Sequence, residues 1–116
     1  MEVEFVATKV DDSLRWFIEE KMKLMGEYVK EEADAMFERE HHTYVHINKH
    51  GTIDSFGMVH KVDGIYLFGY TWHDSSREGR RAFLKGLQVL LDKFGSISIQ
   101  EHNLKVNKIK RLLKGF

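Results

Sequence analysis

The sequence predicts a single α/β domain with a mixed, mainly antiparallel sheet flanked by helices, in the order β-α-α-β-β-β-α-β-α. Apolar residues recur at steps of three and four in several stretches, which is the period of an amphipathic helix. Between these stretches, apolar and polar residues alternate in segments separated by Gly and Asx turn signals, a pattern typical of a strand meander. The 116 residues contain no proline and no cysteine, and this length favours one domain spanning 1–116.

The composition excludes several classes of protein. The chain has 18 Lys and Arg against 18 Asp and Glu, so its net charge is zero, which makes nucleic-acid binding an unfavoured function. Without cysteine it forms no disulfide and no thiolate metal site. The sequence shows no signal-peptide pattern and no run of 18 apolar residues. We therefore expect a cytoplasmic protein without membrane contact.

The N-terminal third predicts a strand and two helices. Residues 2–8 alternate and are rich in β-prone side chains. A helical period extends over 12–39, after candidate N-caps at 11–13. Gly26 lies inside this stretch and lowers helix stability by about 1 kcal/mol relative to Ala, so we expect the helix to break there into two.

The middle of the chain predicts three strands joined by two turns. Alternating segments cover 43–48, 52–62 and 65–72. Asp63-Gly64 is a two-residue turn signal, which would place Val62 opposite Ile65 and His60 opposite Leu67. The loop of the first hairpin is either Lys49-His50-Gly51 or His50-Gly51 alone. In the third segment we expect Tyr66, Phe68, Tyr70 and Trp72 to share one face, with Ile65, Leu67, Gly69 and Thr71 on the other.

The last third predicts a helix, a strand and a helix. The helix covers about 76–94, capped by Ser75 or Ser76 and ended by Gly95. Residues 96–100 are a short strand, and residues 105–114 form the last helix. This last segment is locally basic, which suits either a helix C-terminus or docking to an acidic partner or nucleic acid. Its basic residues are Lys105, Lys108, Lys110, Arg111 and Lys114.

This element order resembles the GNAT superfamily of acyl-CoA-dependent N-acetyltransferases, in a shortened form similar to small phage-encoded acetyltransferase-like proteins. The resemblance covers nearly the whole chain, from the first strand to Gly115-Phe116, and rests on topology more than on motif. The family's C-terminal strands have no counterpart. The resemblance implies a fold with a phosphate-binding turn after the fourth strand and acetyl-CoA as cofactor. We expect no metal, because no carboxylate and no His-Glu-x-x-His spacing completes a set of ligands with the histidines.

The resemblance places the cofactor turn, of the form [Gln/Arg]-x-x-Gly-x-[Gly/Ala], at residues 76–82. In one register Gly79 matches, but Ser76 and Arg81 do not; in the next, Arg77 and Ala82 match, but Arg80 replaces the glycine. Guanidinium groups and a helix N-terminus can still bind phosphate, although a solvated helix start has the same composition. The cofactor-binding residues implied are Trp72, Ser76, Arg77, Gly79, Arg80, Arg81, Ala82 and Asn103.

Two ionisable residues lie near the implied reaction centre. Asp74 and His73 are the candidates for the general base that takes a proton from the amine. Asp74 is equally suited to capping the following helix. Arg111 stands where the family usually has its tyrosine acid.

Histidines and aromatic residues allow two further interpretations. In an extended strand, His46, Asn48 and His50 would share a face, with His60 on the neighbouring strand. This face is either a metal site or, more simply, a solvated polar surface. The aromatic residues could form a base-stacking platform, but most have core spacing.

The sequence therefore leaves two classes of function. The first is an acetyl-CoA-dependent N-acetyltransferase. The second is a non-catalytic binding or structural protein on a GNAT-like scaffold, for example a phage virion component. In both, the strand at 96–100 would be an exposed edge that a protein partner or a second copy pairs with.

Overall fold

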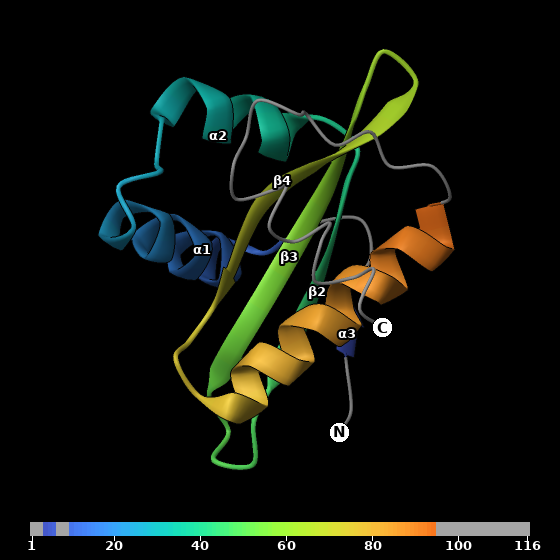
Figure 1. Ribbon diagram of the computed structural model, residues 1–116. Helices are drawn as coiled ribbons and strands as arrows, with labels where there is room; N and C mark the ends of the chain where they lie inside the picture. Colours follow the sequence, from blue (N-terminus) through green and yellow to red (C-terminus); the bar gives the residue numbers. More distant parts are fainter. Residues whose placement is uncertain (1–3, 7–9, 95–116) are drawn as a thin grey trace.

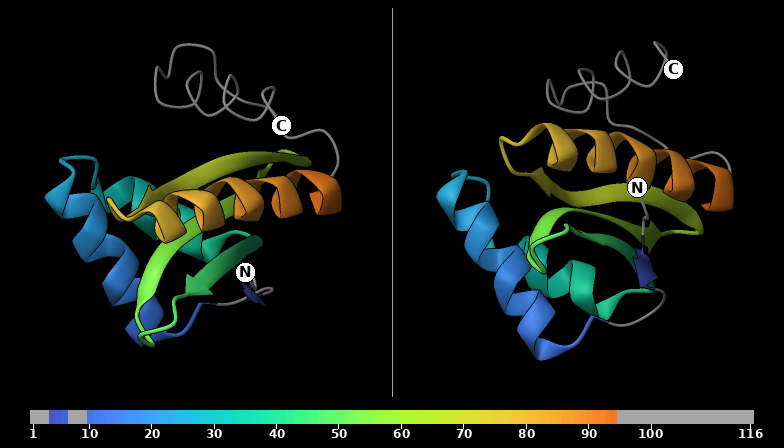
Figure 2. Two further views of the ribbon diagram at one scale, coloured as in Figure 1. Left: turned by 60° about the horizontal axis from the view of Figure 1, so that its bottom comes forward. Right: turned by 90° about the horizontal axis from the view of Figure 1, so that it is seen from below.

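The computed structural model describes residues 4–6 and 10–94. The strands form one four-stranded sheet in the order β1-β2-β3-β4, and every neighbouring pair is antiparallel. Helices α1 and α2 cover one face of this sheet and α3 covers the other (Figures 1 and 2). The elements are β1 (Glu4–Val6), α1 (Asp12–Leu24), α2 (Lys30–Glu38), β2 (His41–Ile47), β3 (Ile53–Val62), β4 (Ile65–His73) and α3 (Arg77–Phe94).

An antiparallel sheet flanked by helices is thus confirmed, and every element predicted up to residue 94 is present. The strand expected at 96–100 and the helix expected at 105–114 lie outside the described residues, as does Asn103. The free edge expected at 96–100 stays a prediction for the same reason.

The predicted break between two helices is confirmed at Gly26. The side chain of Asp11 caps α1, since its Oδ1 accepts a hydrogen bond of 2.7 Å from the backbone N–H of Leu14. Gly26 has a φ of +71°, a left-handed conformation that glycine adopts without a steric penalty. The chain therefore leaves the helix axis after α1 and starts α2 on a new one.

Each face of the sheet carries its own hydrophobic core. On the α1 and α2 side the buried residues are Ile18, Met22, Ala33, Met36, Val45, Phe56, Met58 and Tyr70. On the α3 side they are Tyr44, Val59, Phe83, Leu87 and Leu90. The sheet is consequently apolar on both sides, as expected for a sheet covered twice.

The two hairpins have different loops. In the β3–β4 hairpin, Val62 pairs with Ile65 and His60 with Leu67, so the predicted register is confirmed. In the β2–β3 hairpin, the N–H of Asn48 donates to the carbonyl of Thr52 at 2.9 Å. The tip therefore comprises residues 49–51, which is the longer of the two predicted alternatives.

A β-bulge divides β4. Gly57 pairs with Thr71, whereas Val59 pairs with Phe68, so a two-residue step on β3 faces a three-residue step on β4. The extra residue reverses the side-chain alternation beyond it. The expectation that four aromatic residues of β4 share one face is wrong for this reason: Tyr66 and Phe68 pack with the α3 core, and Tyr70 and Trp72 with the α1 and α2 core.

Candidate functional site

A capping network joins the end of β4 to the start of α3. Ser76 is the N-cap, because its Oγ accepts a hydrogen bond of 2.9 Å from the N–H of Gly79. Asp74 supports it from outside the helix: its Oδ1 accepts from the N–H of Ser76 at 2.9 Å and from the Ser76 hydroxyl at 2.5 Å. The Asp74 carboxylate is thus engaged in orienting the helix, and of the two predicted caps the structure selects Ser76.

Two residues that the resemblance assigns to cofactor binding lie in the protein interior. Gly79 and Ala82 are buried. A Cβ on Gly79 would overlap Oδ1 of Asp74 and lie 3.0 Å from the carbonyl oxygen of Asp54. The glycine therefore allows the first turn of α3 to approach the sheet closely, and its N–H is already donated to Ser76.

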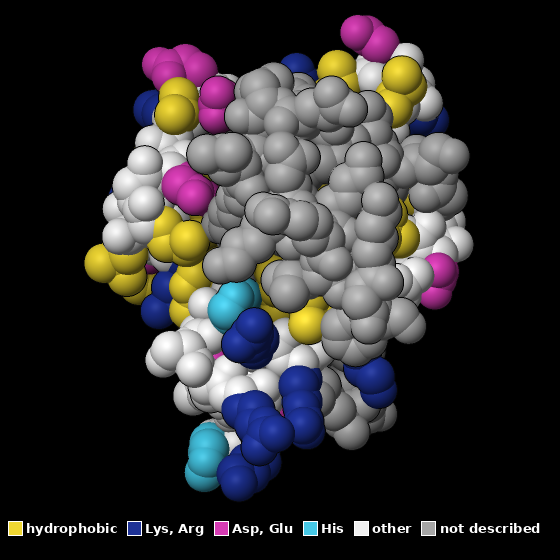
Figure 3. All heavy atoms as spheres, in the orientation of Figure 1, with side chains coloured by type: hydrophobic (Ala, Val, Ile, Leu, Met, Phe, Trp, Pro, Cys, Tyr) yellow, Lys and Arg dark blue, Asp and Glu magenta, His cyan; other side chains and the backbone are white. Residues whose placement is uncertain are grey.

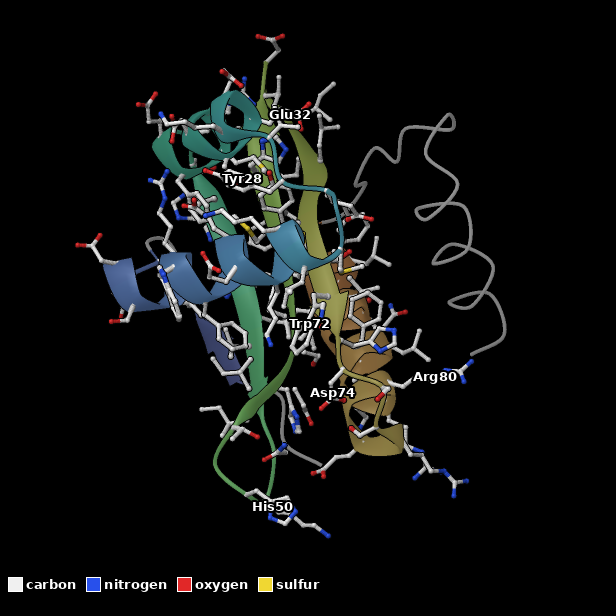
Figure 4. All side chains as sticks on the ribbon, turned by 90° about the vertical axis from the view of Figure 1, so that its left-hand side faces the viewer. Tyr28, Glu32, His50, Trp72, Asp74 and Arg80 are labelled. Atoms are coloured by element: carbon white, nitrogen blue, oxygen red, sulfur yellow. The ribbon has the colours of Figure 1, made fainter. Side chains whose placement is uncertain are left out.

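Three arginines occupy the solvent side of the same two helical turns. Arg77, Arg80 and Arg81 are exposed. Figure 3 shows Lys and Arg side chains gathered at the lower end of the molecule, where α3 begins, and in Figure 4 Arg80 points away from the sheet. The positive charges of these arginines reinforce the positive potential that the dipole of α3 produces at its N-terminus. The surface is suited to an anion, and guanidinium groups suit phosphate in particular.

His73 ends β4 next to this basic surface. The side chain is exposed, and its ring lies 4.8 Å from the ring of Phe83. Its Nδ1 lies 2.7 Å from the carbonyl oxygen of Asp74, and because a carbonyl can only accept, Nδ1 carries the proton. In the neutral ring, Nε2 then holds the lone pair, whereas Oδ1 of Asp74 already accepts two hydrogen bonds from Ser76.

Trp72 lies on the other face of the sheet. Its ring stacks on Phe56 at 5.7 Å between centroids and meets Phe17 edge-on at 5.8 Å. The Lys21 Nζ lies 4.9 Å above it. Figure 4 shows Trp72 beside α1, and Asp74 at the junction of β4 and α3. The structure therefore brings Ser76, Asp74, His73 and the arginines together, but places Trp72 in the opposite core.

A buried pair of hydrogen-bonded side chains lies on neighbouring strands, and sequence reasoning missed it. Nδ1 of His46 lies 2.7 Å from Oδ1 of Asp54, and the side chains are 3% and 0% exposed. The second carboxylate oxygen of Asp54 and the hydroxyl of Ser55 are buried without a hydrogen-bond partner. The signal was an acid at the second position of a strand whose next five residues are apolar or small, but its partner became visible only with the register.

The histidine face expected from the sequence is wrong. Strand β2 ends at Ile47, so His50 lies in the hairpin tip (Figure 4) instead of continuing the strand beyond His46. His60 pairs with His41, at the opposite end of β2. Within residues 4–6 and 10–94, no group of three or more His, Asp and Glu side chains is placed to hold a metal ion.

In the part of the chain that the structure describes, no helix has both the length and the apolar character needed to cross a membrane. Comparisons of the chain with family models, with curated proteins and with solved structures found no match in any of the three.

Proposed function

We propose that this chain is a GNAT-like domain that binds acetyl-CoA at the start of α3 and transfers the acetyl group to an amine. The observation that carries the proposal is the exposed cluster of Arg77, Arg80 and Arg81 on the first turns of α3, the helix on which the His73 ring contacts Phe83 at 4.8 Å. The order β-α-α-β-β-β-α up to Phe94 supports it, since this is the order that the resemblance implies. The bulge in β4 supports it further, because bulges are frequent next to active sites.

The cofactor would be held mainly by charge. The three guanidinium groups offer forked donors to a pyrophosphate, and the dipole of α3 adds to the attraction. The buried Gly79 instead positions the helix, because it lets α3 approach Asp74 and the backbone of Asp54. Arginine side chains therefore replace, in this proposal, the backbone contacts that the glycines of the family's turn allow.

His73 is the proposed proton acceptor. Acetyl-CoA would supply an activated thioester: the amine would form a C–N bond to the carbonyl carbon as the C–S bond breaks, CoA would leave as the thiolate, and the proton lost by the amine would go to His73. The Nε2 lone pair of His73 is on an exposed ring, and its tautomer is set by the Nδ1–H donated to Asp74 O. Asp74 acts as a positioning residue, through its backbone carbonyl toward His73 and its carboxylate toward Ser76.

A second candidate, favoured by one observation, is a non-catalytic binding or structural protein on the same scaffold. The N–H of Gly79 is already donated to Ser76, and the residue faces the core. A turn that relied on this N–H to bind pyrophosphate would therefore have lost a donor. In this alternative the arginine surface would bind a protein partner or a second copy.

Calorimetric titration with acetyl-CoA and CoA tests the proposal. We expect micromolar binding by the wild type and at least a tenfold loss in Arg77→Glu/Arg80→Glu, because the variant reverses two of the three charges. Lys30→Glu/Lys61→Glu makes the same change of net charge on α2 and at the far end of β3, away from the start of α3, and should bind like the wild type. His73→Ala should retain binding and lose transfer to an amine. If millimolar CoA does not bind to the wild type, the non-catalytic alternative is favoured.

A further inference from the structure

A groove with apolar walls lies between the first turns of α1 and the ends of β2 and β3 that meet in their hairpin. Its volume is about 820 Å³, which lies within the range of small-molecule sites. Figure 4 shows how α1 crosses these strands. The lining residues of the groove include Asp11, Asp12, Trp16, Phe17, Val45 and Ile47.

The apolar part of the groove has a buried floor and exposed walls. Val45 is 4% exposed and belongs to the core, whereas Trp16 is 66% exposed and Ile47 is 48% exposed. Trp16 on α1 and Ile47 on β2 line the same groove. Together they expose a larger apolar surface than isolated side chains do. A ligand that covers them would remove this surface from water, which is favourable.

The polar part of the groove is acidic. Asp11 and Asp12 are the charged residues among the described residues that line the groove, and none of these described residues is basic. Oδ1 of Asp11 caps α1, while Asp12 is exposed on its first turn. Among the described residues, neither carboxylate forms an ion pair with Lys, Arg or His. A cationic group would satisfy these carboxylates by charge-assisted hydrogen bonds.

We propose that this groove binds a small apolar amine, with an aromatic or branched aliphatic body and a protonated amino group. The body would lie against Phe17, Val45 and Ile47, and the ammonium group would lie beside Asp12. An anionic ligand is disfavoured by two carboxylates, and a fully apolar one would leave them unpaired. The site is independent of the proposed function, because it opens on the α1 side of the sheet and the arginine surface lies on α3.

Fluorescence of Trp16 reports directly on this groove. The chain has two tryptophans, so Trp72→Phe leaves Trp16 as the single reporter and keeps an aromatic ring against Phe56. This protein is titrated with 3-phenylpropylamine and with 3-phenylpropan-1-ol, which differ in charge but hardly in shape. We expect saturable binding of both, with the amine about three- to fivefold tighter, as befits one solvent-exposed ion pair.

Matched variants test each half of the site. Asp12→Asn should reduce binding of the amine to the level of the alcohol, whereas Asp63→Asn, which removes a carboxylate from the distant β3–β4 turn, should change nothing. Ile47→Ser should weaken both ligands about tenfold. Its control is Ile65→Ser, because Ile65 is 52% exposed on a strand outside the groove, and it should leave both affinities unchanged.

Three results would overturn the proposal. They are equal affinity for amine and alcohol, unchanged binding in Ile47→Ser, and no saturable change of Trp16 fluorescence up to the solubility limit. A change of Trp16 fluorescence with protein concentration in the absence of ligand would also overturn it, because a second copy would then occupy the groove.

Discussion

His60 is a buried histidine whose surroundings favour its neutral form. It is 8% exposed on β3. Nη1 of Arg39 lies 3.3 Å from its Nδ1, and because a guanidinium group can only donate, the imidazole nitrogen accepts. Burial, together with the charge of Arg39 and the neighbouring His41, lowers the pKa of His60 to about 4.

This lowered pKa predicts a loss of stability in mild acid. In the unfolded chain the pKa of a histidine is about 6.5, so between pH 6.5 and 4 the unfolded state binds more protons than the folded state. The free energy of unfolding should therefore be highest above pH 6.5 and fall by about 3 kcal/mol as the pH decreases to 4. Urea denaturation at pH 7, 5.5 and 4.5 measures this slope.

His60→Gln is the control for the pH experiment. Glutamine keeps an acceptor for Arg39 but does not titrate, so its unfolding free energy should depend much less on pH in this range. A slope as steep in His60→Gln as in the wild type would assign the effect to other groups and contradict the prediction.

At the scale of elements, α3 packs on the sheet through two glycines that enclose one tyrosine. Tyr44 is fully buried, and its hydroxyl donates to the carbonyl of Phe83 at 3.3 Å. A Cβ on Gly57 would lie 2.6 Å from Cε1 of Tyr44, and a Cβ on Gly86 would overlap the ring from the helix side. The separation of α3 from β2 and β3 is thus set by an aromatic ring with no room on either side.

Gly86→Ala should destabilise the protein although alanine is the better helix former. The helix gains about 1 kcal/mol from the substitution, but the methyl group meets a buried ring, and overpacking costs typically 1–3 kcal/mol or more. We expect the free energy of unfolding to fall by about 1–2 kcal/mol in urea denaturation.

A double-mutant cycle isolates the cause in this element. In a Tyr44→Leu background the ring is absent, so Gly86→Ala should be neutral or stabilising there. If Gly86→Ala were equally destabilising in both backgrounds, the contact with Tyr44 would not be the reason.

At the scale of the whole molecule, the sheet separates two cores. Ile18 of α1 and Leu90 of α3 are both fully buried, but they belong to the cores on opposite faces. Ile18 and Leu90 belong to different clusters of contacting side chains, although both residues pack on the same sheet. Distant sites of this kind contribute independently to stability unless the sheet between them deforms.

Ile18→Val and Leu90→Ala should therefore be additive. The first should cost about 1 kcal/mol and the second about 2–4 kcal/mol, because each removes buried methyl or methylene groups. The double variant should equal their sum to within about 0.5 kcal/mol in chemical denaturation. A coupling above about 1 kcal/mol would show that the sheet transmits packing changes from one core to the other.

The sequence by itself determined the secondary structure up to residue 94. The break at Gly26, the Asp63-Gly64 turn with its register, and the cap of α3 at 75–76 follow from local preferences. Hydrophobic period and turn chemistry act over a few residues, so a single sequence carries them. It also placed His73 and Asp74 at the end of the last strand of the meander, directly before the helix that Ser76 caps.

Only the tertiary structure decided which side chains meet across elements. The bulge in β4 sends Trp72 to the α1 core although the alternation predicts one aromatic face. Likewise, the pairing of His46 with Asp54 depends on strand register, and the burial of Gly79 depends on where α3 approaches the sheet. These features arise from contacts between residues distant in the chain, and local sequence patterns do not encode a one-residue insertion in a strand or the distance between two layers.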